Sequence, residues 1–277
     1  MNRFLATVYI CLISLGQLFA NIADGTNAAS LEIVYLANEG VFIRSGEQEV
    51  IIDGLFREGV SRYMTLPDDL REELETASGD FESCDLILVT HLHSDHFDAA
   101  SVYRHLVNNL RAQLVAGQDV AGLVKTEAGR NFSEIRERVT APLLEWKQDT
   151  TFIVKGIKIT LLRTRHGWWK NYGLDHFGFV VELNGKRILH LGDIEMTEEN
   201  LLQFKQHLIN IDVAILPHWL MTYDKGIKLT RQYIKAKEFI AVHVEPENLT
   251  EITRNVLTAF PNAEIAGDAR QKLSYVN

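Results

Sequence analysis

Cysteine is scarce in this chain, with only two residues among 277. Cys11 lies in an apolar N-terminal stretch, and Cys84 stands alone in the rest of the sequence. A single cysteine can form neither an internal disulfide nor a four-cysteine zinc site, so both kinds of scaffold are excluded. Because Cys84 opens the strand-like run CDLILV, we expect a buried, unreactive thiol and a fold stabilised by its apolar core.

An excess of basic residues is also missing. The chain has 28 Lys and Arg against 37 Asp and Glu, a net charge of −9, and the cations are scattered along the sequence. A general nucleic-acid binder needs a basic face to neutralise phosphates, so we expect no nucleic-acid partner. A small anionic substrate remains compatible with this charge, because a bound metal ion can dominate the field around it.

Long apolar runs are limited to the N-terminus. Arg3 precedes a largely apolar stretch at 4–20, and Ala20 and Ala23 are small residues suited to cleavage. Polar interruptions distinguish this stretch from a transmembrane helix, which needs about 20 apolar residues. We therefore predict a secretory signal peptide at 1–23 and an exported protein, periplasmic or secreted, with no stable membrane insertion after cleavage. An uncleaved N-terminal anchor is the alternative.

Residues 24–277 contain no linker or low-complexity segment, and we expect them to form a single domain. Predicted strands lie at 31–37, 41–44, 49–53, 85–90, 113–116, 151–154, 158–164, 177–183, 187–191, 213–216, 239–242 and 273–276. Predicted helices lie at 67–77, 98–110, 198–207, 231–237 and 247–258. Strands open each half of the chain and strand–helix units close it. This order predicts an α/β fold in which two β-sheets lie face to face with helices outside.

Four potential metal ligands fall within the six residues 91–96, HLHSDH. His91 and His93 are two positions apart, so their side chains point to the same side of an extended backbone. Asp95 and His96 follow where the chain turns towards a predicted helix. Imidazole and carboxylate are ligands of Zn²⁺, Mn²⁺ and Fe²⁺. A loop rich in histidine by chance is the alternative, but the whole chain has only ten histidines.

The run THLHSDH at 90–96 resembles the metal signature of the metallo-β-lactamase superfamily. The resemblance covers nearly all of the chain after the predicted signal peptide, including the run IIDG at 51–54. It implies a four-layer αββα sandwich with the metal site at the sheet edge, and a metal-dependent hydrolase. The run NEGVFI at 38–43 and the compact length are most similar to the branch that contains ascorbate-6-phosphate lactonase.

The resemblance also implies three later ligands, each directly after a predicted strand. His166 follows LLRTR, Asp193 ends RILHLGD and His243 ends FIAVH. A surface histidine and a helix-capping aspartate are the alternatives for the first two. His218, after another strand, competes with His243. Chain order and the downstream helix favour His243 as the ligand and leave His218 a role on the substrate side.

The family pattern divides seven ligands between two metal positions: His91, His93 and His166 at the first, Asp95, His96 and His243 at the second, and Asp193 between them. We therefore expect two divalent ions, with zinc as the first choice and manganese or iron as alternatives. A water shared by the two ions would attack the substrate. Asp95 is the expected catalytic residue, which orients that water and takes its proton.

The substrate is less well specified than the metal site. Trp168 and Trp169 follow directly on His166, and we expect at least one of them to form an apolar wall of the site. The alternative is that both tryptophans simply cover the sheet edge. The expected reaction is hydrolysis of a lactone, ester or phosphoester in a small molecule. An exported β-lactamase and a non-catalytic periplasmic metal-binding protein are the alternatives. The sequence does not specify the oligomeric state.

Overall fold

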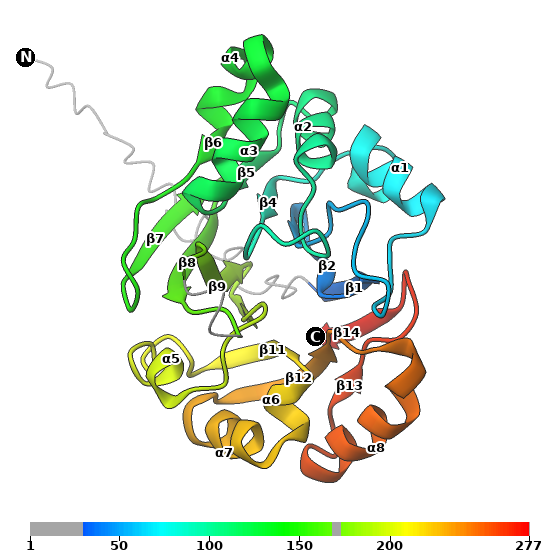
Figure 1. Ribbon diagram of the computed structural model, residues 1–277, viewed down its shortest axis with the longest axis vertical. Coiled ribbons are helices and arrows are strands. Elements are labelled where there is room, and N and C mark those ends of the chain that lie inside the picture. Colours follow the sequence, from blue (N-terminus) through cyan, green and yellow to red (C-terminus); the bar gives the residue numbers. More distant parts are fainter. Residues whose placement is uncertain (1–29, 168–172, 277) are drawn as a thin grey trace, which may run out of the picture.

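The computed structural model describes residues 30–167 and 173–276, which form two seven-stranded sheets packed face to face (Figure 1). The first sheet has the order β14 (Lys272–Val276), β1 (Leu31–Ala37), β2 (Gly40–Ser45), β3 (Gln48–Ile52), β4 (Leu86–Leu88), β5 (Gln113–Val115), β6 (Val139–Thr140). The second has the order β13 (Glu264–Ile265), β12 (Ala236–Val242), β11 (Ile211–Pro217), β10 (Lys186–His190), β9 (His176–Leu183), β8 (Ile157–Thr164), β7 (Asp149–Val154).

Helices cover the outer face of each sheet. Those on the first sheet are α1 (Asp68–Thr76), α2 (Ala99–Asn108), α3 (Gln118–Ala128) and α4 (Phe132–Ile135). Those on the second are α5 (Glu198–Leu202), α6 (Trp219–Thr222), α7 (Asp224–Tyr233) and α8 (Leu249–Ala259). Short 3₁₀ turns join them: η1 (Gly79–Phe81), η2 (Gly129–Asn131), η3 (Arg136–Arg138), η5 (Pro246–Asn248). The four-layer αββα sandwich predicted above is therefore confirmed (Figure 1).

The core between the sheets follows from the alternation of side chains along each strand. Ile33 and Ile43 of the first sheet and Ile159 and Phe179 of the second are fully buried in one apolar cluster. Neighbouring strand residues of opposite parity, such as Leu36, pack instead under the outer helices. Because each sheet is covered on both faces, its strands are apolar on both sides, as the continuous apolar runs indicate.

Asn184-Gly185, between the strands predicted at 177–183 and 187–191, is a strong sequence signal for a hairpin, and the hairpin is present. Asn184 and Gly185 have φ values of 46° and 78°, the left-handed pair that a type I′ turn requires. The hairpin joins β9 to β10 in antiparallel register, with Leu183 opposite Lys186. After this hairpin, β10, β11 and β12 run parallel, so their carboxyl ends meet at one edge of the sheet.

Several predicted helices differ from the structure. The helix at 118–128 was missed, although Val120, Val124 and Ala128 are spaced for one buried face, because Gly122 weakens its helical signal. The helix predicted at 231–237 instead spans α7, and residues 236–237 already belong to β12. Gly226 lets α7 pack closely on α6: a Cβ there would lie 2.3 Å from the Trp219 carbonyl oxygen, so only glycine permits this approach. The helix predicted at 198–207 ends at Leu202.

The single cysteine outside the N-terminal stretch has the environment that the sequence predicts. Cys84 is fully buried and its thiol donates to the Leu86 carbonyl oxygen at 3.4 Å. Burial raises the pKa of this thiol to about 12, so it is protonated and unreactive at neutral pH. The predicted signal peptide at 1–23 lies outside the described residues. Within 30–167 and 173–276, no helix has the length and apolar character needed to cross a bilayer.

Candidate metal centre

The predicted ligands all lie at the same edge of the sandwich. The loop after β4 carries the cluster at 91–96, and single ligands follow β8, β10 and β12. Strands β8, β10 and β12 point in the same direction, because β8 and β10 each pair antiparallel to β9 and β12 runs parallel through β11. Ligand sites in α/β folds form beyond the carboxyl ends of such strands. The topology therefore brings together residues that are up to about 150 positions apart.

A tight turn shapes the loop that carries the first four candidates. The amides of His96 and Phe97 both donate to the His93 carbonyl oxygen, at 3.0 and 2.9 Å. The turn ends where the Asp98 side chain accepts from the Ser101 amide at 2.8 Å and caps α2. This arrangement holds the side chains of the loop at the strand end instead of continuing the sheet.

The first group consists of three histidines beside Asp193. His91 Nε2 lies 3.0 Å from His93 Nδ1, and His166 Nε2 lies 3.2 Å from Asp193 Oδ2. The ring centre of His166 is 4.6 Å from those of both His91 and His93. The ligand atoms of all four residues lie within 4.8 Å of one another, close enough to hold one ion.

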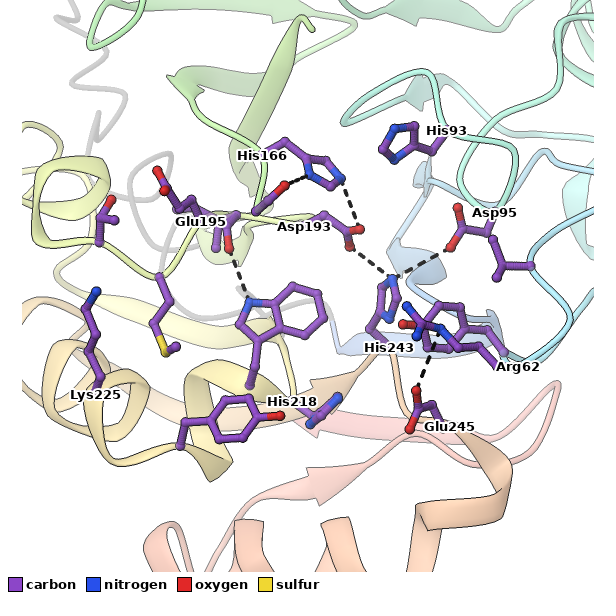
Figure 2. Close-up of a pocket in the computed structure, with 18 residues that line it drawn as sticks. Arg62, His93, Asp95, His166, Asp193, Glu195, His218, Lys225, His243 and Glu245 are labelled. Carbon is purple, nitrogen blue, oxygen red and sulfur yellow. Dashed lines mark hydrogen bonds and ion pairs between the residues drawn. The ribbon is translucent and has the colours of Figure 1, made fainter. Parts of the chain in front are cut away.

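The second group consists of Asp95, His96 and His243, again beside Asp193. The Nε2 atoms of His96 and His243 lie 3.8 and 3.7 Å from Asp95 Oδ2. The same two nitrogens lie 3.4 and 3.1 Å from Asp193 Oδ1. Asp193 therefore presents Oδ1 to the second group and Oδ2 to the first, as Figure 2 shows between His166 and His243.

Several buried atoms of this centre that could bind a metal ion lack hydrogen-bond partners among the described residues. They include His96 Nε2, Asp193 Oδ1 and His243 Nε2. Leaving a buried polar atom unsatisfied costs about 1–3 kcal/mol, so several of them converging on one space indicate a missing ligand. Since the converging atoms are imidazole nitrogens and carboxylate oxygens, the residues fit divalent ions at both positions.

Burial and charge set the protonation of these groups. Burial, with a smaller effect from His96, holds the pKa of His91 well below its usual value, so its imidazole is neutral and able to bind a metal ion. Burial would lower the pKa of His96 as well, but the carboxylates of Asp193 and Asp53 outweigh it and raise this pKa well above the usual value. Without a metal ion, the second group therefore holds a proton that an ion must displace.

Asp53 is a functional residue that sequence analysis did not single out. Its Oδ2 accepts from His96 Nδ1 at 2.8 Å and from the Thr90 hydroxyl at 2.5 Å, and its Oδ1 accepts from the Thr90 amide at 2.8 Å. These bonds turn His96 Nε2 towards the metal position. Asp53 directly follows a buried strand with a φ of 49°, and His243 has a φ of 59°. Such conformations are uncommon in residues other than glycine and concentrate at functional sites.

Other supporting contacts come from the turn between β1 and β2. Asn38 Nδ2 donates to both the backbone oxygen and Oδ2 of Asp95, each at 3.2 Å. The Asn38 carbonyl oxygen accepts from the His243 amide at 3.1 Å. This turn therefore fixes two candidate ligands from opposite halves of the chain. In the sequence this turn was marked only by the run NEGVFI at 38–43, which gives no sign of these contacts.

One histidine outside the metal centre is also buried. His105 in α2 is fully covered, and its Nδ1 bonds the Leu74 carbonyl oxygen at 2.5 Å. Burial lowers its pKa to about 4. It lies in the packing of α2 against α1 and takes no part in the metal centre.

An open pocket of about 710 Å³ lies over the centre (Figure 2). His93, Asp95, His166, Asp193 and His243 form its metal side. The remaining wall combines aromatic and charged residues (Tyr63, Trp219, Tyr223, Arg62, Lys225, Glu195, Glu245) with the apolar Val60, Ile194 and Met196.

His218 lines the same pocket below His243 (Figure 2), and its amide donates to the carbonyl oxygen of Val242 at 3.0 Å. Trp219 packs its ring 5.1 Å from that of His243. Tyr63, from the irregular segment before α1, packs edge-on against His243 with ring centres 4.1 Å apart. Sequence analysis missed Tyr63 because no periodic pattern marks that segment. The predicted wall residues Trp168 and Trp169 lie outside the described residues.

Comparison with known proteins agrees with this geometry. The model of the beta-lactamase superfamily domain matches residues 62–259, a span that contains all seven candidate ligands. A metal-dependent hydrolase of Polynucleobacter asymbioticus is 26% identical over 200 residues, 65% of this chain and 63% of that protein, a little under two thirds of its length. A metal-dependent hydrolase of Pyrococcus abyssi is 26% identical over 77% of this chain and 84% of its own. Among solved structures, the metallo hydrolase Igni18 of Ignicoccus hospitalis superposes with a TM-score of 0.60 at 16% identity, covering 90% of this chain and 99% of that one.

Proposed function

This chain belongs to the metallo-β-lactamase superfamily, and on that premise we propose that it is a two-metal hydrolase of small-molecule lactones, esters or phosphoesters. Membership of this superfamily and the names of the relatives support the prediction of a metal-dependent hydrolase at the level of enzyme class. The number of ions, their identity and the bond cleaved belong to the proposal. Resemblance to the ascorbate-6-phosphate lactonase branch remains a prediction from the run at 38–43.

The position of Asp193 is the observation that carries the two-metal proposal. One carboxylate oxygen faces His166 at 3.2 Å, and the other faces His96 and His243 at 3.4 and 3.1 Å. A carboxylate that presents its two oxygens to two separate ligand groups is suited to bridge two ions. The donor set of imidazoles and carboxylates supports zinc as the first candidate, with manganese or iron as alternatives.

Two divalent ions at these positions would lower the pKa of a water between them and polarise a carbonyl or phosphoryl oxygen of the substrate. Asp95 lies at the pocket surface and faces His96 and His243, so its carboxylate can orient that water and take its proton. Asn38 donates to Asp95 Oδ2 at 3.2 Å and keeps this oxygen directed at the centre. Asp95 is therefore the proposed proton acceptor.

The pocket supports catalysis rather than metal storage. A purely structural metal site is closed by protein ligands, whereas a catalytic site keeps an open position. Here His93, Asp95 and Asp193 line an open cavity of about 710 Å³, a volume in the range of small-molecule sites. This geometry favours hydrolysis over the alternative of a non-catalytic metal-binding protein.

His218 is the proposed substrate-side residue. Burial lowers its pKa to about 4, with a smaller effect from His243, so the imidazole is neutral at physiological pH. A neutral imidazole can either donate or accept one hydrogen bond at the pocket wall. Lys225, also at the wall and exposed, can pair with an anionic group of the substrate.

Export of the protein also stays a proposal, based on the N-terminal sequence alone.

The proposed function is tested by metal analysis followed by activity assays on the full chain. The panel consists of p-nitrophenyl esters, lactones, p-nitrophenyl phosphodiesters and a chromogenic cephalosporin, each with and without prior chelation. We expect two ions per chain and turnover of a lactone, ester or phosphodiester that chelation abolishes. Turnover of the cephalosporin alone would establish the β-lactamase alternative. Two ions without turnover on any substrate would favour the binding protein.

A further inference from the structure

Glu39, in the turn between β1 and β2, is a fully buried carboxylate without an assigned role. Its exposed fraction is 0%, and neither side-chain oxygen has a hydrogen-bond partner among the described residues. The nearest basic atom is His190 Nε2, 4.0 Å from Oε2. A buried carboxyl group in this state needs a proton or a cation to be tolerated.

The backbone around Glu39 is fixed from three sides. Its carbonyl oxygen bonds His190 Nε2 at 3.0 Å, and the neighbouring Asn38 carbonyl oxygen accepts from the His243 amide at 3.1 Å. At Gly40 a Cβ would lie 2.8 Å from the Asp53 carbonyl oxygen, so the turn packs too closely for any side chain there. The turn therefore holds the Glu39 side chain inside the sandwich, beneath the metal centre.

Glu39 belongs to two groups of candidate ligands, and one of them is already satisfied. In the group of Glu39, Asp53 and His190, the oxygens of Asp53 accept from Thr90 and His96, and His190 Nε2 bonds the Glu39 backbone. Both oxygens of Asp53 and both ring nitrogens of His190 therefore already have hydrogen-bond partners. This group is a hydrogen-bonded support, not a metal site.

The other group has open donors. Glu39, Asp193 and His243 place their ligand atoms within 4.8 Å of one another, and all three are buried. Asp193 Oδ1, His243 Nε2 and both Glu39 oxygens lack hydrogen-bond partners among the described residues. We propose that Glu39 is a further carboxylate ligand of the second metal position, in addition to Asp95, His96, His243 and the bridging Asp193. This inference rests on the two-metal centre proposed above.

A ligand beneath the centre would make the second position richer in negative charge without closing the pocket. Asp95 binds from the pocket side, whereas Glu39 does not line the pocket. The substrate face of the ion therefore stays open. Carboxylate oxygens also favour harder ions, so Glu39 would shift the preference of this position towards manganese or iron relative to the first position, whose only carboxylate is that of Asp193.

The test compares Glu39→Gln with Glu49→Gln in the full chain. Glu49 in β3 is a matched control, because it is also buried and has an unpartnered Oε2, but it lies at the end of β3 that is paired with Asp85, away from the ligands. Each metal-free protein is titrated with Co²⁺, with bound metal counted by elemental analysis and the visible absorption of Co²⁺ recorded.

We expect wild type and Glu49→Gln to bind two ions with the same spectrum. Glu39→Gln should still bind the ion at the first position with wild-type affinity. It should bind the ion at the second position about 10–100-fold more weakly, and the visible spectrum of that ion should change. Wild-type affinity and an unchanged spectrum for the second ion in Glu39→Gln would overturn the inference. Failure of wild type to bind a second ion would instead overturn the two-metal proposal itself.

Thermal denaturation separates ligation from a structural role for Glu39. Metal-free Glu39→Gln should melt at the same temperature as metal-free wild type or higher, because it no longer buries an unpartnered carboxyl group. Added metal should then stabilise the variant less than it stabilises wild type. A lower melting temperature already in the metal-free variant, with an unchanged shift on metal addition, would contradict ligation.

Discussion

The two metal positions differ in charge and in what surrounds them. The first is formed by His91, His93 and His166, and the only carboxylate in its ligand group is that of Asp193. The second has Asp95 as well, and Asp53 bonds the far side of His96. Because protein carboxylates attract a cation more strongly than neutral imidazoles, the second position should hold its ion more tightly but depend more on protonation.

The two positions also differ in how the chain assembles them. Each position takes two ligands from the loop at 91–96 and one from a strand end of the second sheet, His166 or His243. The second position is also bonded by Asn38 and Asp53, which lie in the first sheet's turns. Both positions therefore depend on contacts between the two sheets, and the second depends in addition on hydrogen bonds from Asn38 and Asp53. The comparison leads to four predictions, ordered from the largest expected effect to the smallest.

Asp193→Ala should have the largest effect, because it removes the one ligand that both positions share. We expect metal content to fall from two ions towards none and activity to fall by roughly 10³-fold or more, since a centre that orients and activates water is lost. Elemental analysis and steady-state assays measure the two effects. Asp224→Ala, at an exposed aspartate on α7, should change neither. Two ions retained in Asp193→Ala would contradict the bridging role.

Asp53→Asn should separate the positions, because Asp53 bonds only His96 among the candidate ligands. Loss of such a supporting carboxylate weakens metal binding by about 10–100-fold, and we expect this at the second position alone. Stepwise titration with Co²⁺ measures the metal affinity of each position. Asp85→Asn is the control, since Asp85 is also buried but lies before β4, at the opposite end from the ligands. Equal weakening of both ions would show that the positions are not independently supported.

Acid should weaken the second ion more than the first. The pKa of His96 is raised well above its usual value by the carboxylates around it, so below that pKa an ion must displace its proton. Each unit of pH decrease then lowers the apparent affinity about tenfold. The pKa of His91 is held well below the usual value by burial, so this ligand of the first position is already deprotonated at neutral pH. Metal titrations between about pH 6 and pH 8 test this, and parallel loss of both ions would refute it.

The smallest effect concerns His105, a buried histidine outside both positions. Its pKa is about 6.5 in the unfolded chain and about 4 when folded, so it stabilises the fold fully above pH 6.5. As pH falls from 6.5 to about 4, only the unfolded state gains the proton, and about 3 kcal/mol of stability is lost. His105→Gln should flatten the acid side of the stability curve in chemical denaturation and leave metal content unchanged. If the stability of His105→Gln and of wild type fell in parallel as the pH is lowered, the role given to His105 would be contradicted.

Sequence patterns predicted the parts of this molecule that are local. The strand at 31–37 appears with the expected bounds, and Asn184-Gly185 forms the expected turn, because each depends on neighbouring residues. The loop at 91–96 could likewise be recognised by itself. His166, Asp193 and His243 followed from chain order in a known family, and the structure brings all of them together with that loop.

The supporting residues could not be predicted because they act across long distances in the sequence. The bond between His96 and Asp53 spans 43 positions, and the bond between His190 and Glu39 spans 151. No periodicity marks such pairs, and each residue alone is typical of a turn after a strand. A positive φ at Asp53 is visible only once the strands are paired. The helix at 118–128 was missed for a different reason, the glycine in its middle.

The proposed catalytic centre requires two ions, one on each side of Asp193. A crystal structure of the zinc-loaded protein, with anomalous diffraction recorded at the zinc absorption edge, measures this directly. We predict two anomalous peaks about 3.5–4 Å apart, each near one carboxylate oxygen of Asp193. A single peak among His91, His93 and His166, with the second group empty at saturating zinc, would contradict the account.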